Sequence, residues 1–214
     1  RGVVQAVIAD SWLTEPGADA EPDDELRLRV RNQFSAVNQW HTDAVYRAMI
    51  SVFPCVQPGG VYFEHNAPRG PGSANAFVLF EADSPADTFL AEINNYIRDQ
   101  GNHGHGDDLL VLEMPATLHA VRVTVWPKAE VGAERWPALK SDIELFVRAA
   151  FRESTASDYQ PTLTHPQSRF SFSRLGEELH QQFTGIDSLH FDNADILSEL
   201  TIPRLSGVEV VLNA

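Results

Sequence analysis

The stretch LLVLEMPATLHAVRVTVW, residues 109–126, contains two strand patterns separated by a proline. Residues 109–114 are a short apolar run, typical of a buried strand, and Pro115 ends it. Beyond the proline, apolar and polar residues alternate, with Val121, Val123 and Val125 on one face and Arg122 and Thr124 on the other. Period-two alternation indicates a strand with one face in water. The stretch therefore predicts two strands, one on each side of Pro115.

The residues before this stretch predict helices first and a short strand afterwards. Residues 21–34 begin with a run of acids, which the helix dipole favours in a first turn. Their apolar residues then recur at helical spacing, and residues 41–53 show a second, shorter helical pattern that Thr42 can cap. Residues 61–63 form a short apolar run between proline- and glycine-rich turns, which indicates a strand.

Strand and helix patterns then alternate along the rest of the chain. We expect strands at 76–80, 109–114 and 118–126, helices after Ser84 and at 135–153, an exposed loop at 154–168, and then a strand at 169–172, a helix at 173–183 and strands at 187–191 and 207–213. The predicted fold class is α+β. The predicted division is an N-terminal helical segment with a short strand at 1–73, a first α+β unit at 74–117 and a second at 118–214.

Composition narrows the classes of function. The 214 residues include 30 acidic and 16 basic ones, giving a formal charge of −14 that disfavours nucleic-acid backbones as partners. No run of about 18 apolar residues is present, so we expect no membrane span. Cys55 is the sole cysteine, which excludes an internal disulfide and a cysteine-rich zinc module. The sequence begins at Arg1 rather than methionine, and we expect a fragment or a processed product.

The run HGHGDD, residues 103–108, is a candidate metal site. It resembles the His-x-His-x-Asp-His signature of metallo-β-lactamase-type hydrolases up to its last residue, and His103, His105 and Asp107 are possible ligands. In that fold, however, the motif follows a strand and leads into a helix, whereas here it follows a helix and precedes a strand. The other histidines form no second cluster, so the pattern favours a helix-to-strand loop and no cofactor.

Several stretches, taken in order, resemble the baseplate J-like proteins of contractile-tailed phages. The stretches that carry this resemblance are PGADAEPDDELRLRVRNQF (16–34), HTDAVYRAMISVF (41–53), GPGSANAFVLF (70–80), AEINNYIRDQGNHGHGDDLLVLEMPATLHAVRVTVW (91–126), SRLGEELHQQFTGIDSLHF (173–191) and LTIPRLSGVEV (200–210). Together they span roughly residues 10 to 213. In the family, the HGHGDD position is a loop between a helix and a strand.

The resemblance implies a structural component of the baseplate wedge, without catalytic residues, that joins subunits around the tail hub. It implies other wedge and hub proteins as partners, self-association in a ring, and a location in the virion tail after assembly in the host cytoplasm. For such a role we expect interface residues at Trp12, Arg27, Arg31 and Trp40. The alternative function is a metal-dependent hydrolase centred on His103, His105 and Asp107.

Overall fold

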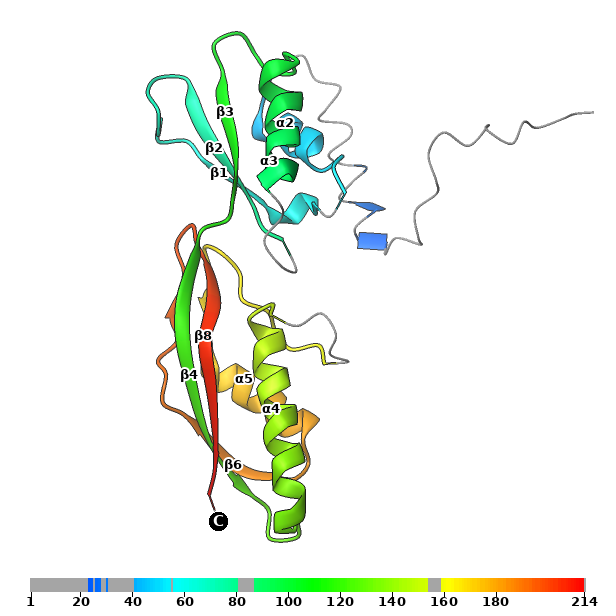
Figure 1. Cartoon of the computed structure of the whole chain (residues 1–214), viewed down its shortest axis with the longest axis vertical. Helices are drawn as coiled ribbons and strands as arrows, with labels where there is room; N and C mark the ends of the chain where they lie inside the picture. Colours follow the sequence, from blue (N-terminus) through cyan, green and yellow to red (C-terminus); the bar gives the residue numbers. More distant parts are fainter. Residues whose placement is uncertain are drawn as a thin grey trace, which may run out of the picture.

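The computed structural model describes residues 23–24, 26–27, 30, 41–54, 56–80, 87–153 and 159–213. Figure 1 shows two α+β units arranged along the long axis of the molecule. The first contains α2 (Asp43–Ile50), β1 (Val61–Glu64), β2 (Ser73–Val78), α3 (Asp87–Asn94) and β3 (Asp108–Glu113). The second contains β4 (Ala116–Pro127), α4 (Trp136–Ala150), β5 (Arg169–Phe170), α5 (Phe172–Gln182), β6 (Ile186–Phe191), β7 (Ile196–Leu197) and β8 (Ile202–Leu212). The predicted α+β class is confirmed.

The first unit is a three-stranded sheet in the order β1-β2-β3. β1 and β2 are antiparallel, and β2 and β3 are parallel because the chain crosses over through α3. Ile93 on α3 and Ile97 in the π-helical turn Asn95–Asp99 are fully buried against the sheet, as their helical spacing predicts. The predicted boundary between residues 73 and 74 falls within strand β2 of this sheet. The division of the chain into domains stays a prediction.

The Asn94 side chain attaches α3 to the free edge of β3. Its amide nitrogen donates to the Val111 carbonyl oxygen (2.8 Å), and its amide oxygen accepts from the Val111 N–H (2.8 Å). Val111 pairs with β2 through its Cα register, but its main-chain groups point away from that strand. The edge of this sheet is therefore closed at its centre by a side chain.

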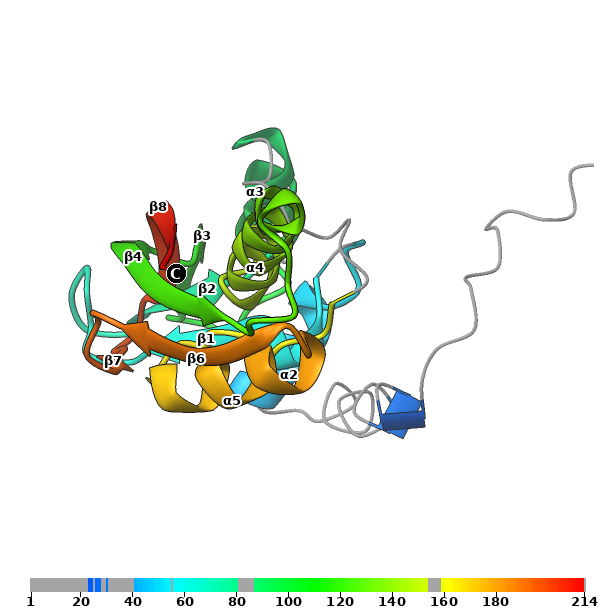
Figure 2. The same ribbon diagram turned by 90° about the horizontal axis from the view of Figure 1, so that it is seen from below.

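The second unit has the sheet order β6-β4-β8, with β6 antiparallel and β8 parallel to β4. Val121, Val123 and Val125 are buried on one face, as the alternation predicts. They pack in one apolar cluster with residues of both helices, among them Ile143, Phe146, Val147, Leu175 and Leu179. Figure 2 shows α4 beside β4 and β8, and α5 beside β6. No described helix covers the opposite face of this sheet.

The predicted loop at 154–168 is confirmed for its described part, but its predicted exposure is wrong at Pro161, Thr164 and Pro166, which are buried. Thr164 is completely buried, and its N–H donates to the Ala150 carbonyl oxygen at the end of α4 (2.9 Å). The Arg152 guanidinium, also buried, donates to the Thr164 carbonyl oxygen (2.8 Å). Serine, threonine and proline in this segment suggested solvent exposure, but these hydrogen bonds satisfy its polar groups inside the protein.

The two units meet at the chain link Met114–Pro115. Met114 donates its N–H to the Val78 carbonyl oxygen of the first unit, and Pro115 accepts from the Ile202 N–H of the second. Leu79, Met114 and Ile202 form a buried cluster across the junction. Burial also raises the pKa of the Tyr62 hydroxyl, which packs against this cluster. Apolar burial thus joins the units directly.

Arg204 on β8 reinforces the junction with hydrogen bonds to both units. Its guanidinium donates to the carbonyl oxygens of Phe80 (3.1 Å) in the first unit and Arg152 (2.8 Å) in the second. Each of these carbonyl groups would lose a partner if the guanidinium were removed, and a buried unsatisfied carbonyl is costly.

We expect Arg204→Met to lower the free energy of unfolding by about 2–4 kcal/mol, because it keeps the aliphatic stem but removes the donor that these carbonyl groups share. Chemical denaturation measures this change. The control is Arg174→Met on α5, which breaks an exposed ion pair to Glu178 (3.3 Å) and should cost at most about 1 kcal/mol. Equal losses in the two variants would contradict the role of Arg204.

Candidate interaction surfaces

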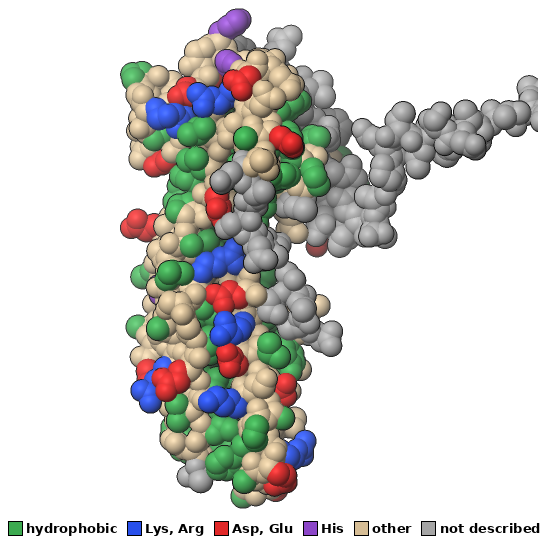
Figure 3. All heavy atoms as spheres, viewed as in Figure 1, with side chains coloured by type: hydrophobic (Ala, Val, Ile, Leu, Met, Phe, Trp, Pro, Cys, Tyr) green, Lys and Arg blue, Asp and Glu red, His purple; other side chains and the backbone are tan. Residues whose placement is uncertain are grey.

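The HGHGDD run forms a tight loop between the end of the α3 segment and β3. Gly101 and Gly106 have positive φ angles of 76° and 90°, so both occupy left-handed conformations that suit glycine. A ring nitrogen of His103 lies 2.8 Å from the Gly104 carbonyl oxygen, and His105 is exposed. Histidine side chains are visible at this tip of the molecule in Figure 3. The predicted helix-to-strand placement is confirmed.

Tyr46 on α2 holds the loop through its hydroxyl group. The hydroxyl donates to Asp107 Oδ2 (2.8 Å) and accepts from the Gly104 N–H (3.3 Å). Burial raises the pKa of Tyr46 to about 12, and the hydrogen bond to Asp107 adds to this shift. The phenol therefore stays protonated at neutral pH, and one carboxylate oxygen of Asp107 is occupied by it.

Arg69 connects the bend before β2 to the start of β3. Its Nε donates to Asp108 Oδ2 (2.8 Å) and its Nη2 to the Asp108 carbonyl oxygen (2.7 Å). This hydrogen bonding, helped by Arg98 at 3.3 Å, holds the pKa of Asp108 below its usual range. The two glycine-rich segments, PRGPGS and HGHGDD, therefore form one interlocked tip.

The tip does not assemble the alternative metal site. Among the residues that the structure describes, no three histidine, cysteine, aspartate or glutamate side chains are grouped so that they could hold a metal ion. Asp107 is engaged by Tyr46, and His103 faces its own loop. His103, His105 and Asp107 are therefore close together in the sequence, but the fold does not arrange them as a set of metal ligands.

One of the four predicted interface residues lies in the described part of the chain. Arg27 is helical and 72% exposed, and its guanidinium pairs with Asp24 at 3.0 Å, one helical turn away. Such an exposed pair contributes little to stability and leaves the arginine accessible. Trp12, Arg31 and Trp40 lie outside the described residues, so their interface role stays a prediction.

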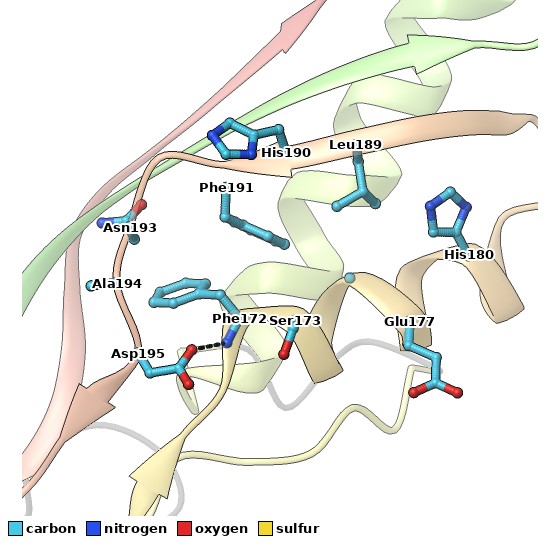
Figure 4. A pocket seen from close by; sticks show the side chains of 11 residues that line it. Phe172, Ser173, Glu177, His180, Leu189, His190, Phe191, Asn193, Ala194 and Asp195 are labelled. Carbon is cyan, nitrogen blue, oxygen red and sulfur yellow. Dashed lines mark hydrogen bonds between the residues drawn. The ribbon is translucent and has the colours of Figure 1, made fainter.

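Sequence analysis missed a groove between α5 and the free edge of β6 (Figure 4). Phe172, Leu189 and Phe191 supply its apolar wall, and His180 and Glu177 lie along its rim. Gly176 permits this close approach of helix and strand, because an added Cβ would lie 3.1 Å from Leu189 Cδ1. A glycine in the interior of a helical pattern is the sequence signal that could have indicated it.

Asp195 closes one end of this groove. It accepts the Phe172 N–H (3.0 Å) at the start of α5 and pairs with Arg169 (2.5 Å) on β5. The Arg169 hydrogen bond, together with that from Phe172, holds the pKa of Asp195 below its usual range. The carboxylate therefore fixes the helix start relative to β5 and is already occupied by protein donors.

A second groove lies beside the far end of β8. Trp136, Pro137 and Lys140 line it from the first turns of α4, and residues 209–212 line it from the strand. The two grooves thus lie beside opposite edge strands of the same sheet. Shallow, mixed apolar and polar grooves next to strand edges suit protein partners better than a small substrate.

A comparison with known proteins places these surfaces in context. The chain is 42% identical over 167 residues to a protein of Haemophilus phage HP1 (strain HP1c1) named "Putative baseplate protein gp29". The chain is therefore similar to part of a protein that is named for the phage baseplate. The matched residues make up 77% of this chain and 42% of the baseplate relative, so the chain spans less than half of that protein's length.

No protein-family model matches the chain, so the finer resemblance to baseplate J-like proteins rests on its motifs. Among the described residues, no helix has the length and apolar character needed to cross a bilayer.

The tip provides a stability test with a matched control. Gly72 has a φ of 81°, and a Cβ on it would lie 2.6 Å from the Gly106 carbonyl oxygen, whereas Gly101 has a φ of 76° and open space. We expect Gly101→Ala to cost about 1 kcal/mol from backbone strain and Gly72→Ala about 2–4 kcal/mol, because it adds a clash to similar strain. Thermal or chemical unfolding measures both. Equal costs would show that the bend and the loop are not interlocked.

Tyr46→Phe should cost about 1–2 kcal/mol at neutral pH, because it removes a donor to Asp107 and an acceptor for Gly104. An unfolded tyrosine ionises near its ordinary pKa of 10.0, whereas native Tyr46 keeps its proton up to about 12. The stabilisation from Tyr46 is therefore complete below pH 10 and is lost as the pH rises through the native pKa. The free energies of unfolding of the two proteins should therefore converge as the pH rises above 10. A difference between them that stays constant with pH would contradict this linkage.

Proposed function

We propose that the chain is a structural component of a phage tail baseplate and that it joins neighbouring subunits there. The observation that carries the proposal is the 42% identity over 167 residues to a protein named for the baseplate of phage HP1. Identity of this extent between two chains implies a shared fold. The role of the relative, however, belongs to a protein more than twice as long as the matched segment.

The finer proposal is that the chain acts as a wedge component of the baseplate J-like type, in a phage or a related contractile injection machine. Its partners would be other wedge and hub proteins. It would be located in the virion tail baseplate, and it would be assembled there in the host cytoplasm. A wedge component needs stiffness and several accessible surfaces. Buried apolar contacts and Arg204 join the two units, and the grooves beside β6 and β8 are open, which supports this role.

In this proposal the protein has no catalytic role, and its contribution is to bind and orient neighbouring subunits. The acidic surface, with a formal charge of −14, favours partners with basic patches over nucleic acid. Figure 3 shows acidic and basic side chains interspersed along the visible face of the second unit, the pattern of a solvated surface with specific polar contacts.

The test is assembly in the source phage or prophage. We expect the chain to be found in purified baseplates by mass spectrometry and by labelled electron microscopy at the tail end. A combined variant with Arg27→Glu, Arg31→Glu and Trp40→Ala should reduce baseplate yield at least tenfold, because it reverses two charges and removes one aromatic anchor. The control combines Arg27→Lys, Arg31→Lys and Trp40→Phe, which keep charge and aromaticity. Baseplates that lack the protein would refute the proposed function.

A further inference from the structure

The sheet of the second unit ends in two edge strands, β6 and β8. An edge strand presents unpaired N–H and C=O groups, and proteins usually block these with side chains, prolines or bulges. In the first unit, Asn94 closes the β3 edge at Val111.

The first half of β8 is closed to further pairing. The Ile202 N–H donates to the Pro115 carbonyl oxygen, so the main-chain groups of Ile202 face β4. Because successive residues of a strand turn their main-chain groups to opposite sides, those of Pro203 and Leu205 point away from β4. Pro203 has no N–H, and its carbonyl oxygen accepts from Thr164 Oγ1 (3.1 Å). The Leu205 N–H donates to Glu153 Oε1 (3.0 Å). Here too, side chains and a proline occupy the edge.

Among the described residues, none protects the second half of β8 in this way. After the bulge beside His119, the Asn213 N–H donates to the Val125 carbonyl oxygen, so the main-chain groups of Asn213 face β4 and those of every second residue before it do the same. The outward-facing residues are therefore Val208, Val210 and Leu212. Within the part of the chain that the structure describes, no hydrogen bond to their outward main-chain groups is found.

With respect to the described residues, the β6 edge is open in the same way. The Asp192 N–H donates to the Arg122 carbonyl oxygen (3.1 Å), so the alternating residues Leu189 and Phe191 point their main-chain groups away from β4. No described residue pairs with these groups. The groove of Figure 4 runs beside this edge, between the strand and α5.

We propose that β6 of one copy of this chain pairs with the second half of β8 of a second copy, so that the sheets join side by side. The edge of each copy that remains free can pair again, and such head-to-tail contacts close into a ring when the rotation between copies allows it. The inference rests on the proposed function, because it names a second copy as the neighbour that the chain joins.

The topology favours this pairing. A rotation about an axis parallel to the strands keeps β4 in the same direction in all copies. Because β8 is parallel and β6 antiparallel to β4, the new pair is antiparallel. Leu189 and Phe191 point their side chains to the helix-covered face, as do Val208, Val210 and Leu212, so the apolar core would continue from one copy into the next.

Each groove is lined by a charged residue that the other can complement. Glu209 in the groove beside β8 is paired with Arg122, and Asp195 in the groove beside β6 is paired with Arg169. Lys140 beside β8 and Glu177 beside β6 are therefore the opposite charges that the seam between copies can bring together. The formal charge of −14 on each copy opposes association at long range. Because salt screens long-range repulsion more than it weakens main-chain hydrogen bonds, association should strengthen at higher ionic strength.

Two edge-blocking variants test the pairing. Leu189→Pro removes an outward N–H from β6, and Val208→Pro removes one from β8, where the preceding Gly207 tolerates the proline. Neither substitution removes a hydrogen bond to β4. Leu118→Ser, on the uncovered sheet face where Leu118 is 68% exposed, is the control for contact through that face. Circular dichroism and thermal unfolding check that each variant is folded.

Sedimentation and light scattering give the readout. We expect the unmodified chain and Leu118→Ser to form oligomers that grow with concentration, and each proline variant alone to be a monomer. An equimolar mixture of the two proline variants should give a one-to-one heterodimer, because each retains the edge that the other lacks. Three results would each overturn the proposal. They are dimers of Leu189→Pro alone, an equimolar mixture of the two proline variants that forms no heterodimer, and an unmodified chain that is monomeric at its solubility limit.

Amide hydrogen exchange on the unmodified chain gives a second test that needs no variant. The N–H groups of Val208, Val210 and Leu212 should exchange at least tenfold more slowly as concentration rises, whereas those of Glu209 and Val211 are protected by β4 throughout. Oligomers without this change would place the contact elsewhere and leave the proposed function standing. Edge pairing in solution by a chain that is absent from baseplates would refute the proposed function alone.

Discussion

The fold depends on the continuity of the chain through Pro115. β3 and β4 are separated by Met114 and Pro115, so one nearly continuous extended segment supplies a strand to each sheet. Hydrogen bonds flank this link on both sides, from Met114 to Val78 and from Ile202 to Pro115. Pro115 has no N–H to contribute, which ends pairing in the first sheet and lets the chain start a new one.

On either side of this link, side chains close the free edges of the strands by binding their main-chain groups. In the first unit, α3 crosses over one face and Asn94 closes the edge of β3. In the second unit, β8 is added parallel to β4, and its early edge is closed by Thr164 and Glu153. These points are closed within the chain. Among the described residues, none closes the later part of β8, which is the part that we propose for a partner.

The sequence predicted the elements whose patterns are local. The alternating valines of β4, the apolar stripe of α4 and the turn at Gly101 depend on spacing and backbone chemistry, which one sequence displays. It also indicated that HGHGDD is a loop. The strand pairings, the burial of Thr164 and the partnership of Tyr46 with Asp107 depend on residues far apart in the chain. Spacing alone therefore could not reveal them, nor the groove between α5 and β6.

The arrangement at Pro115 also determines how the molecule would carry a mechanical load. Tension applied between the ends of the rod in Figure 1 would pull β4 lengthwise against β6 and β8. Such a shearing load is shared by many ladder hydrogen bonds at once, whereas a peeling load breaks them one after another. The antiparallel and parallel neighbours of β4 would therefore resist extension together, and the Arg204 hydrogen bonds to Phe80 and Arg152 would resist bending at the joint.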